Sequence, residues 1–369
     1  MRTAKQTLTE LLEPFDISIN GSKPYDPQVH RDRFYDRVMA EGVLGVGESY
    51  MDGDWDCEAL DELITRLLRV DFGKQLRPVK MIIPVLRAKL VNQQRRAKSL
   101  RVGKQHYDIG NDLYSRMLDR RMTYTCAYWK DARTLDEAQE AKLDLICRKI
   151  GLKAGMRVLD IGCGWGSFAG YAAEKYGASV VGITISREQL DFARQRYGHL
   201  DTEFRFQDYR DVDESFDRIV SVGMFEHVGP KNYRTYMRVA ERCLRNEGLF
   251  LLHTIGSNVS RATTDPWTEK YIFPGGVLPS AVQIAQAAEG ILTIKDWHNF
   301  GHYYDRTLMA WYENFHRRRH ELAAYDERFY RMWRYWLLTA AAGFRSHRNH
   351  LWQIVFAKLS GPVEYDSVR

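Results

Sequence analysis

Cysteine is scarce in this 369-residue chain, and the few that occur form no recognisable set. The five cysteines are odd in number and scattered, and no Cys-x-x-Cys pair occurs. Their spacing indicates neither a disulfide framework nor a zinc ribbon, and it favours a reducing compartment. The N-terminal residues have no apolar signal core, and no uninterrupted apolar run approaches membrane-spanning length. We expect a cytoplasmic protein for which any membrane contact is peripheral.

Acidic residues are missing from residues 74–104, although ten lysines and arginines gather there among apolar residues. Two interpretations fit this basic stretch: a solvated helix whose other face lies on the core, or a contact with a membrane surface. Over the whole chain, 54 basic and 48 acidic side chains leave a net charge of +6. That excess is too small to indicate nucleic-acid binding by itself, and it would suit a surface that meets anionic lipid.

The chain is longer than one ordinary domain, and its composition is that of a folded soluble protein. We expect a smaller, mainly helical N-terminal domain over residues 1–90, a basic linker over 91–105 and a second domain over 106–369. In the first part, Leu11 to Ile19 suggests a helix followed by a strand, and Gly42 to Gly53 is rich in turn formers.

Short β-branched and aliphatic runs in the second part alternate with segments of helical periodicity. The predicted strands are 157–161, Ser179 to Ile185, Thr202 to Phe206, Arg218 to Val222 and Leu249 to Thr254. The helices expected around them include Ala138 to Ile150, Ser167 to Tyr176 and Arg187 to Tyr197. This alternation predicts a parallel α/β sheet of the Rossmann-like class. Two later runs, Leu292 to Trp297 and Leu351 to Phe356, are expected to form a reversed hairpin at the sheet edge.

A glycine loop follows the first predicted strand, where residues 158–166 read Val-Leu-Asp-Ile-Gly-Cys-Gly-Trp-Gly. The alternating glycines let the backbone turn sharply and approach a ligand. Asp160 stands just before them, and Gly162 and Gly164 follow. A carboxylate in this place would repel a pyrophosphate but could hold an ammonium group. The pattern therefore favours a cationic nucleoside without phosphate, and S-adenosylmethionine fits that description.

The ends of the next two strands agree with this interpretation. After the second strand, Thr184 stands where most methyltransferases place an acid that holds the ribose, and Gln189 lies one turn into the following helix. After the third strand, Asp208 is suitably placed to accept a hydrogen bond from an adenine amino group. A turn or helix-capping role is the alternative for Asp208. Together the three strand ends predict a methyltransferase with a Rossmann-like fold.

Ordered motifs occur along almost the whole chain. They are Gly45 to Gly53, Tyr124 to Asp131, Leu159 to Gly166, Val181 to Ser186, Met224 to Gly229, Leu252 to Gly256 and Leu351 to Phe356. In these segments the chain resembles bacterial cyclopropane-fatty-acyl-phospholipid synthases. The resemblance implies a transfer of a methylene group from S-adenosylmethionine across a cis double bond of a phospholipid acyl chain. It also implies a homodimer and an N-terminal domain that presents lipid at the inner face of the membrane.

The resemblance further implies that a bound bicarbonate ion serves as the base. The residues that match its site are Glu226, His253 and Tyr304, with the backbone of Cys126 and Ile255. The residues that match the cofactor site are Tyr124, Thr125, Asp160, Gly162, Gly164, Thr184, Gln189 and Asp208. Singly, Glu226 could be an ion-pair residue, His253 a core histidine and Tyr304 an aromatic wall. A zinc site built from Cys126, Glu226 and His253 is disfavoured because the spacings are long and no fourth ligand is evident.

The sequence departs from its relatives at two places. Thr125 replaces the usual serine but keeps a hydroxyl, and Ala340 to Ala342 stand where relatives can carry a cysteine, which excludes a catalytic thiol there. Between Ser257 and Ser280, an aromatic-rich insert could wall an acyl channel or act as a lid. Three other functions stay open: an enzyme that only methylates lipids or fatty acids, a non-enzymatic lipid-binding protein, and a nucleic-acid methyltransferase. Because the net charge is small, no nucleic-acid partner is expected.

Overall fold

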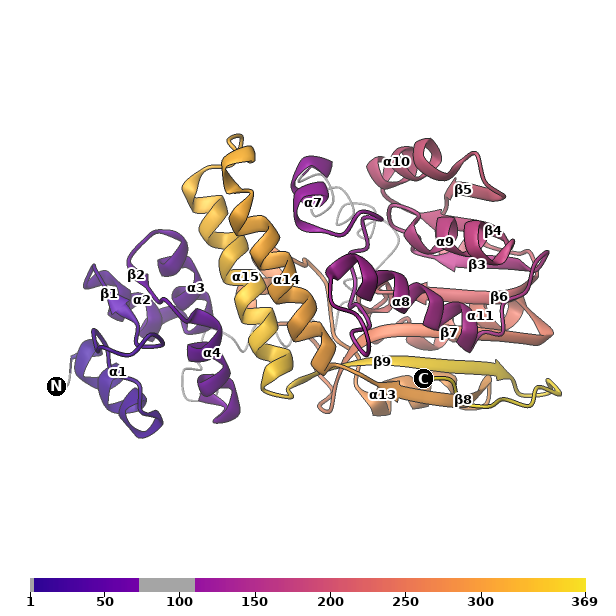
Figure 1. Cartoon of the computed structure of the whole chain (residues 1–369). Helices are drawn as coiled ribbons and strands as arrows, with labels where there is room; N and C mark the ends of the chain where they lie inside the picture. The colour runs from indigo at the N-terminus through magenta and orange to yellow at the C-terminus, as the bar shows by residue number, and fades with distance from the viewer. Residues whose placement is uncertain (1–2, 73–109) are drawn as a thin grey trace.

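A seven-stranded sheet forms the centre of the C-terminal part in the computed structural model, which describes residues 3–72 and 110–369 (Figure 1). The strand order is β5-β4-β3-β6-β7-β9-β8. The parallel strands are β3 (Arg157–Ile161), β4 (Ser179–Thr184), β5 (Thr202–Phe206), β6 (Phe216–Val222) and β7 (Leu244–Ser257). All five predicted strands are thus confirmed, with β7 longer than expected. The chain adds β4 and β5 on one side of β3 and then β6 and β7 on its other side. The glycine loop after β3 therefore lies at the topological switch point, where such sheets bind ligands.

The two later predicted strands and their antiparallel pairing are also confirmed, but they form no hairpin, because residues 300–348 separate them and only the last strand is reversed. The last strand, β9 (Asn349–Lys358), lies between β7 and β8 (Leu292–Asn299) and is antiparallel to both. Its register places Gln353 opposite His253 of β7. An element from the end of the chain therefore borders the part of the sheet from which the predicted base site is built.

Helices cover both faces of the sheet with apolar side chains, so the strands read as buried runs. They are α8 (Leu135–Lys149), α9 (Ser167–Tyr176), α10 (Arg187–Tyr197), α11 (Tyr233–Cys243) and α13 (Ala281–Ala288). The α8 helix begins at a capping box in which Thr134 and Glu137 exchange hydrogen bonds with each other's backbone N–H. The ranges predicted for α9 and α10 are those observed.

Two long helices, α14 (His302–Arg317) and α15 (Glu327–Arg345), stand between the sheet and the N-terminal helices (Figure 1). The N-terminal part contains α1 (Ala4–Leu12), α2 (Arg33–Glu41), α3 (Val43–Met51) and α4 (Leu60–Arg69), with a short ribbon of β1 (Gln28–Val29) and β2 (Trp55–Asp56). Smaller helices are α7 (Asn111–Met117) and α12 (Pro266–Tyr271). Single 3-10 turns are η1 (Glu13–Phe15), η4 (Tyr209–Asp211), η5 (Phe225–His227) and η6 (Arg319–Glu321).

Two local predictions in the N-terminal part are wrong. Residues 43–51 form the helix α3 instead of turns, because their glycines serve close packing. A Cβ on Gly47 would lie 2.3 Å from Cδ1 of Trp267, so only glycine lets α3 approach α12 this closely. The segment after α1 forms the turn η1 and a loop where a strand was expected.

Three predictions lie outside the described residues: the basic linker, the domain boundary at residue 90 and the acid-free stretch 74–104. Among the residues that the structure describes, no helix is both long and apolar enough to cross a bilayer.

Candidate functional site at the carboxyl edge of the sheet

The glycine loop after β3 leaves room for a ligand beside its backbone. Gly162 and Gly164 both have left-handed backbone angles, with φ of +81° and +54°. A Cβ on Gly162 would lie 2.6 Å from Cγ of Met224, whereas a Cβ on Gly164 would meet nothing within 4 Å. The first glycine is therefore required by packing inside the protein. The second lies beside open space, as a loop that approaches a bound nucleoside should.

Asp160 supplies an unsatisfied buried carboxylate at this loop. Its side chain is 2% exposed, and its Oδ2 has no hydrogen-bond partner among the described residues. Burial raises the pKa of Asp160 to about 7, and the positive charge of Lys142 partly opposes this rise. A buried carboxylate with a free oxygen gains most from a cationic partner, so Asp160 fits the ammonium group of an amino-acid ligand.

The other two strand ends are organised by hydrogen bonds within the protein. Thr184 and Gln189 are buried and meet side chain to side chain, at 3.2 Å between Oγ1 and Oε1. Asp208 accepts from the N–H of Arg210 at 3.0 Å and pairs with its guanidinium at 3.3 Å, so it caps the turn η4. The capping alternative is thus present in the structure, and the contact between Asp208 and adenine stays a prediction.

The loop before α8 carries three of the predicted residues. The ring of Tyr124 lies 5.3 Å from that of Trp311 and 5.1 Å from that of Tyr114. The hydroxyl of Thr125 accepts a hydrogen bond of 2.8 Å from Nζ of Lys142. Cys126 is fully buried, and its thiol donates to the carbonyl of Ala127. Burial holds the pKa of Cys126 well above its ordinary value, so the side chain is a neutral, small apolar group as expected.

Glu226 and His253 each present one unsatisfied buried atom at the same edge. The turn η5 carries Glu226, whose Oε1 accepts from the N–H of Ile255 at 2.6 Å while Oε2 has no partner in the described structure. Burial raises the pKa of Glu226 to about 7. The Ile255 N–H is thus used by Glu226, and its direct contact with an anion stays a prediction.

His253 is held in a defined protonation state. It is 1% exposed, and its Nδ1 lies 3.3 Å from Nε2 of Gln353 on β9. Burial, together with the positive charges of Lys142 and Lys149, holds the pKa of His253 well below its ordinary value, so the ring is neutral at pH 7. Because an amide nitrogen only donates, Nδ1 accepts and the proton resides on Nε2. That Nε2–H has no partner among the described residues and is free to bind an anion.

Aromatic rings connect the two halves of the site. Tyr304 on α14 is 7% exposed, packs on Phe344 at 4.6 Å and meets the edge of Trp311 at 6.0 Å. Trp311 also contacts Tyr124, so one indole touches a residue predicted for each half. The described residues contain no group of three His, Cys, Asp or Glu side chains that could hold a metal, so the zinc site that the sequence disfavours gains no support.

Three further polar residues border the site, and the sequence analysis missed them. Gln139 and Lys142 on α8 and Gln353 on β9 are completely buried. Each hydrogen-bonds a predicted site residue. One signal in the sequence could have indicated two of them. The capping box of Thr134 and Glu137 marks where α8 begins, and Gln139 and Lys142 lie one turn apart on the same face of that helix.

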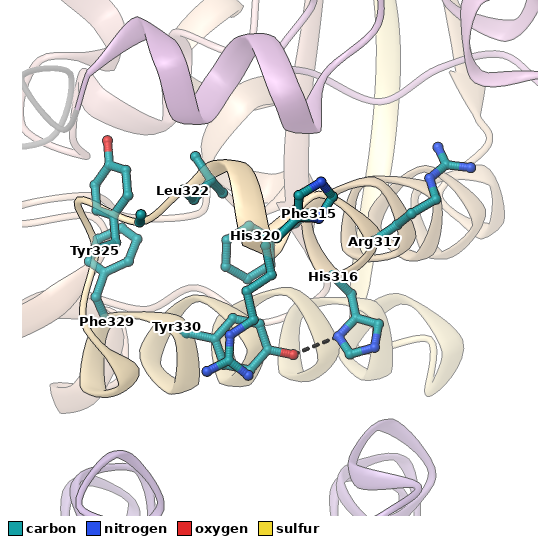
Figure 2. Close-up of a pocket in the computed structure, with 10 residues that line it drawn as sticks. Phe315, His316, Arg317, His320, Leu322, Tyr325, Phe329 and Tyr330 are labelled. Atoms are coloured by element: carbon teal, nitrogen blue, oxygen red, sulfur yellow. Dashed lines mark hydrogen bonds between the residues drawn. The ribbon is translucent and has the colours of Figure 1, made fainter.

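A surface cavity of about 520 Å³ lies elsewhere, between the end of α14 and the start of α15 (Figure 2). Aromatic rings and basic side chains line it, and the hydroxyl of Tyr330 lies 2.6 Å from Nδ1 of His316. No residue of the predicted site lines this cavity, so it is separate from the groups at the sheet edge.

The strand order, the glycine loop and the acid before it define a Rossmann-like S-adenosylmethionine-dependent methyltransferase. Residues 94–354 match the mycolic acid cyclopropane synthetase family. The chain belongs to this family.

Curated relatives match over most of their length. Cyclopropane-fatty-acyl-phospholipid synthase of Escherichia coli (strain K12) is 54% identical over 351 residues, which cover 95% of this chain and 92% of that protein. Tuberculostearic acid methyltransferase UfaA1 of Mycobacterium tuberculosis is 36% identical, covering 94% and 86%. Among solved structures, mycolic acid cyclopropane synthase CmaA1 in complex with SAH and CTAB has a TM-score of 0.66 at 32% identity, covering 70% of this chain and 98% of that one.

Proposed function

We propose that this enzyme transfers a methylene group from S-adenosylmethionine across the cis double bond of an unsaturated phospholipid acyl chain. The product is a cyclopropane ring. One observation supports this most directly: the free Glu226 Oε2 and His253 Nε2–H belong to the same sheet edge as the glycine loop and Asp160. The high identity to the Escherichia coli synthase over 95% of the chain supports the substrate class.

The reaction requires both a methyl donor and a base. The π electrons of the alkene form a new bond to the methyl carbon, and the old carbon–sulfur bond breaks with its electron pair left on sulfur. A base then takes a proton from the new methyl group, and the C–H electron pair closes the three-membered ring. Because an alkene is a weak nucleophile, holding the double bond close to the donor carbon must supply much of the rate.

Glu226, His253 and Tyr304 are suited to hold a small oxyanion as that base. A bicarbonate ion bound there would supply a weak base of the required size. The free Oε2 of Glu226 would accept from its hydroxyl, and His253 Nε2–H would donate to one of its oxygens. A second donor would be the hydroxyl of Tyr304. Such contacts at both ends would fix the orientation of the base.

The aromatic cluster is suited to the positive charge that develops on the acyl chain. Tyr124, Trp311, Tyr304 and Phe344 form a chain of neighbouring rings. Ring faces stabilise a cation without forming a bond to it. We propose that these rings border the position of the double bond.

We propose further that the enzyme is a homodimer that acts at the inner face of the cell membrane, with the basic stretch 74–104 meeting anionic lipid. Two copies would strengthen membrane binding through avidity. Flotation with anionic and neutral vesicles at low and high salt tests the first proposal, and light scattering in solution tests the second.

The decisive experiment incubates the full chain with unsaturated phospholipid vesicles and methyl-labelled S-adenosylmethionine, with and without bicarbonate. We expect a lipid product heavier by CH₂ that resists hydrogenation, with less of it when bicarbonate is removed. A methyl-branched product, or labelling of free fatty acid only, would favour the lipid or fatty-acid methyltransferase alternative. Glu226→Gln should lose product but keep donor binding, and Glu247→Gln at an exposed position is the matched control.

A further inference from the structure

The buried face of α8 holds the loop that carries Tyr124, Thr125 and Cys126. Nε2 of Gln139 donates to the carbonyls of Thr123 at 3.3 Å and Thr125 at 2.8 Å. One turn further along the helix, Nζ of Lys142 donates to the Thr125 hydroxyl at 2.8 Å. Both side chains are completely buried. Two polar groups from one helix therefore fix the backbone and the hydroxyl of a single loop.

The burial of Lys142 is not explained by an ordinary ion pair. Within the described part of the chain, no carboxylate lies within salt-bridge distance of its ammonium group, although leaving a charge inside a protein is costly. The negative charges that face it are those of Asp119 and Asp160, which act on it at longer range. Asp119 is itself occupied, because it accepts from the backbone N–H groups of Arg121 and Thr123. Asp160 is the one of the two with a free oxygen.

We propose that Lys142 is a positioning residue for the methyl donor: it holds the Thr125 hydroxyl and supplies a positive charge that favours the ionised form of the Asp160 carboxyl group. Gln139 assists by fixing the loop backbone. Asp160 can bind the ammonium group of the donor only as a carboxylate. Lys142 thus acts through Asp160 and Thr125 and need not touch the reacting atoms. This inference rests on the donor site of the proposed function.

Burial lowers the pKa of Lys142 itself to about 8, so its ammonium group is charged at pH 7 and loses its proton in the upper part of the tested range. The thiols, the phenol and the imidazole around the pair do not titrate near neutral pH. Lys142 faces the thiol of Cys126 and the imidazole of His253, while Asp160 faces Cys163 and Tyr236. Burial raises the pKa of both thiols and of the phenol and lowers that of the imidazole, so all four are neutral. Burial also raises the pKa of Asp119, which accepts from backbone N–H groups of the loop before α8; this residue is unchanged in every variant below.

The test measures donor binding by calorimetry from pH 6 to pH 9, on the full chain without lipid, with S-adenosylmethionine as the probe. Removing a positive charge raises the pKa of a nearby carboxyl group, by about 1 to 3 units at about 4 to 6 Å and by less at longer range. Lys142→Met should therefore bind the donor several-fold more weakly than wild type at pH 7. The donor's own ammonium group loses its proton over this range in both proteins, so the readout is the ratio of the two dissociation constants. That ratio should fall toward one as the pH rises toward 9, where Asp160 is ionised in both proteins and Lys142 of the wild type has lost its charge. Lys142→Gln, which keeps a polar group without charge, should show the same alkaline displacement.

Lys149→Met is the matched control. Lys149 is a second completely buried lysine of α8, but it pairs with Asp296 and His298 on β8 instead of the donor loop. Its replacement should leave the pH profile of donor binding unchanged while costing similar stability. If Lys142→Met does not fold, Lys142→Gln carries the test.

Three outcomes are distinguishable. An alkaline displacement in both Lys142 variants supports the proposal. Weaker binding by the same factor at every pH overturns it, because a merely structural lysine would act in that way. Failure of the wild-type chain to bind S-adenosylmethionine would overturn the donor site of the proposed function.

Discussion

Replacing Glu226 by glutamine should stabilise the folded protein at alkaline pH while it removes activity. Burial raises the pKa of Glu226 from 4.5 to about 7, a change that corresponds to about 3 kcal/mol. Well below pH 4.5 the carboxyl group is protonated in both the folded and the unfolded chain, so its ionisation does not lower the free energy of unfolding. Between these two values the folded chain binds more protons than the unfolded chain, so stability falls as the pH rises. Above pH 7 the folded chain bears the full cost of an ionised buried carboxylate.

The assay compares the free energy of unfolding of wild type and Glu226→Gln in urea at pH 5 and pH 8. The glutamine amide leaves a buried N–H without a partner, and that cost is the same at both pH values. The difference between variant and wild type should therefore move in favour of the variant by about 2.5 kcal/mol from pH 5 to pH 8, slightly less than the full amount because the carboxyl group of the unfolded chain is already mostly ionised at pH 5. Glu247→Gln removes the same charge from an exposed side chain and should show little change. A difference that is equal at the two pH values would refute the reasoning.

Three further predictions concern the glycines and the aromatic wall. Gly164→Ala should weaken donor binding, because a Cβ would enter the open space beside the loop. Gly155→Ala is the control: Gly155 lies before β3, has a φ of +76° and has equally open surroundings, so its replacement should cost similar stability without affecting donor binding. Gly47→Ala should destabilise the chain by about 1–3 kcal/mol in denaturant unfolding, because its Cβ would overlap Trp267. Tyr304→Phe should keep the ring packing on Phe344 but lower turnover in the labelled-lipid assay, with donor affinity unchanged.

The catalytic sheet was predictable because its signals are local. Buried strands such as Arg157–Ile161 and Ser179–Thr184 read as short apolar runs, and Gly166 and Ser186 mark the starts of the helices that follow. The helix α3 was missed because its glycines were read as turn formers. Gly45 instead makes room for the backbone of Arg37, and Gly47 makes room for Trp267, which is 220 residues away in the chain.

The site was predictable as a set of residues but not as a set of partners. A motif can point to Glu226, but it cannot show that the Ile255 N–H already occupies one of its oxygens. Likewise, the strand end marks Asp208 as a candidate, while only the structure shows that Arg210 engages both its oxygens. Hydrogen-bond partners depend on tertiary packing, which leaves no periodic signal in the sequence.

The antiparallel strand of the sheet fixes the chemical state of His253. Gln353 comes from the reversed strand β9, and its amide decides which nitrogen of His253 carries the proton. Without that amide, the neutral ring could place its proton on Nδ1 and would then offer Nε2 as an acceptor, which repels an anion. The register of β9 against β7 places Gln353 opposite His253, so this pairing depends on the position of β9 beside β7. The reversed strand therefore contributes to the base site as well as joining β7 to the edge strand β8.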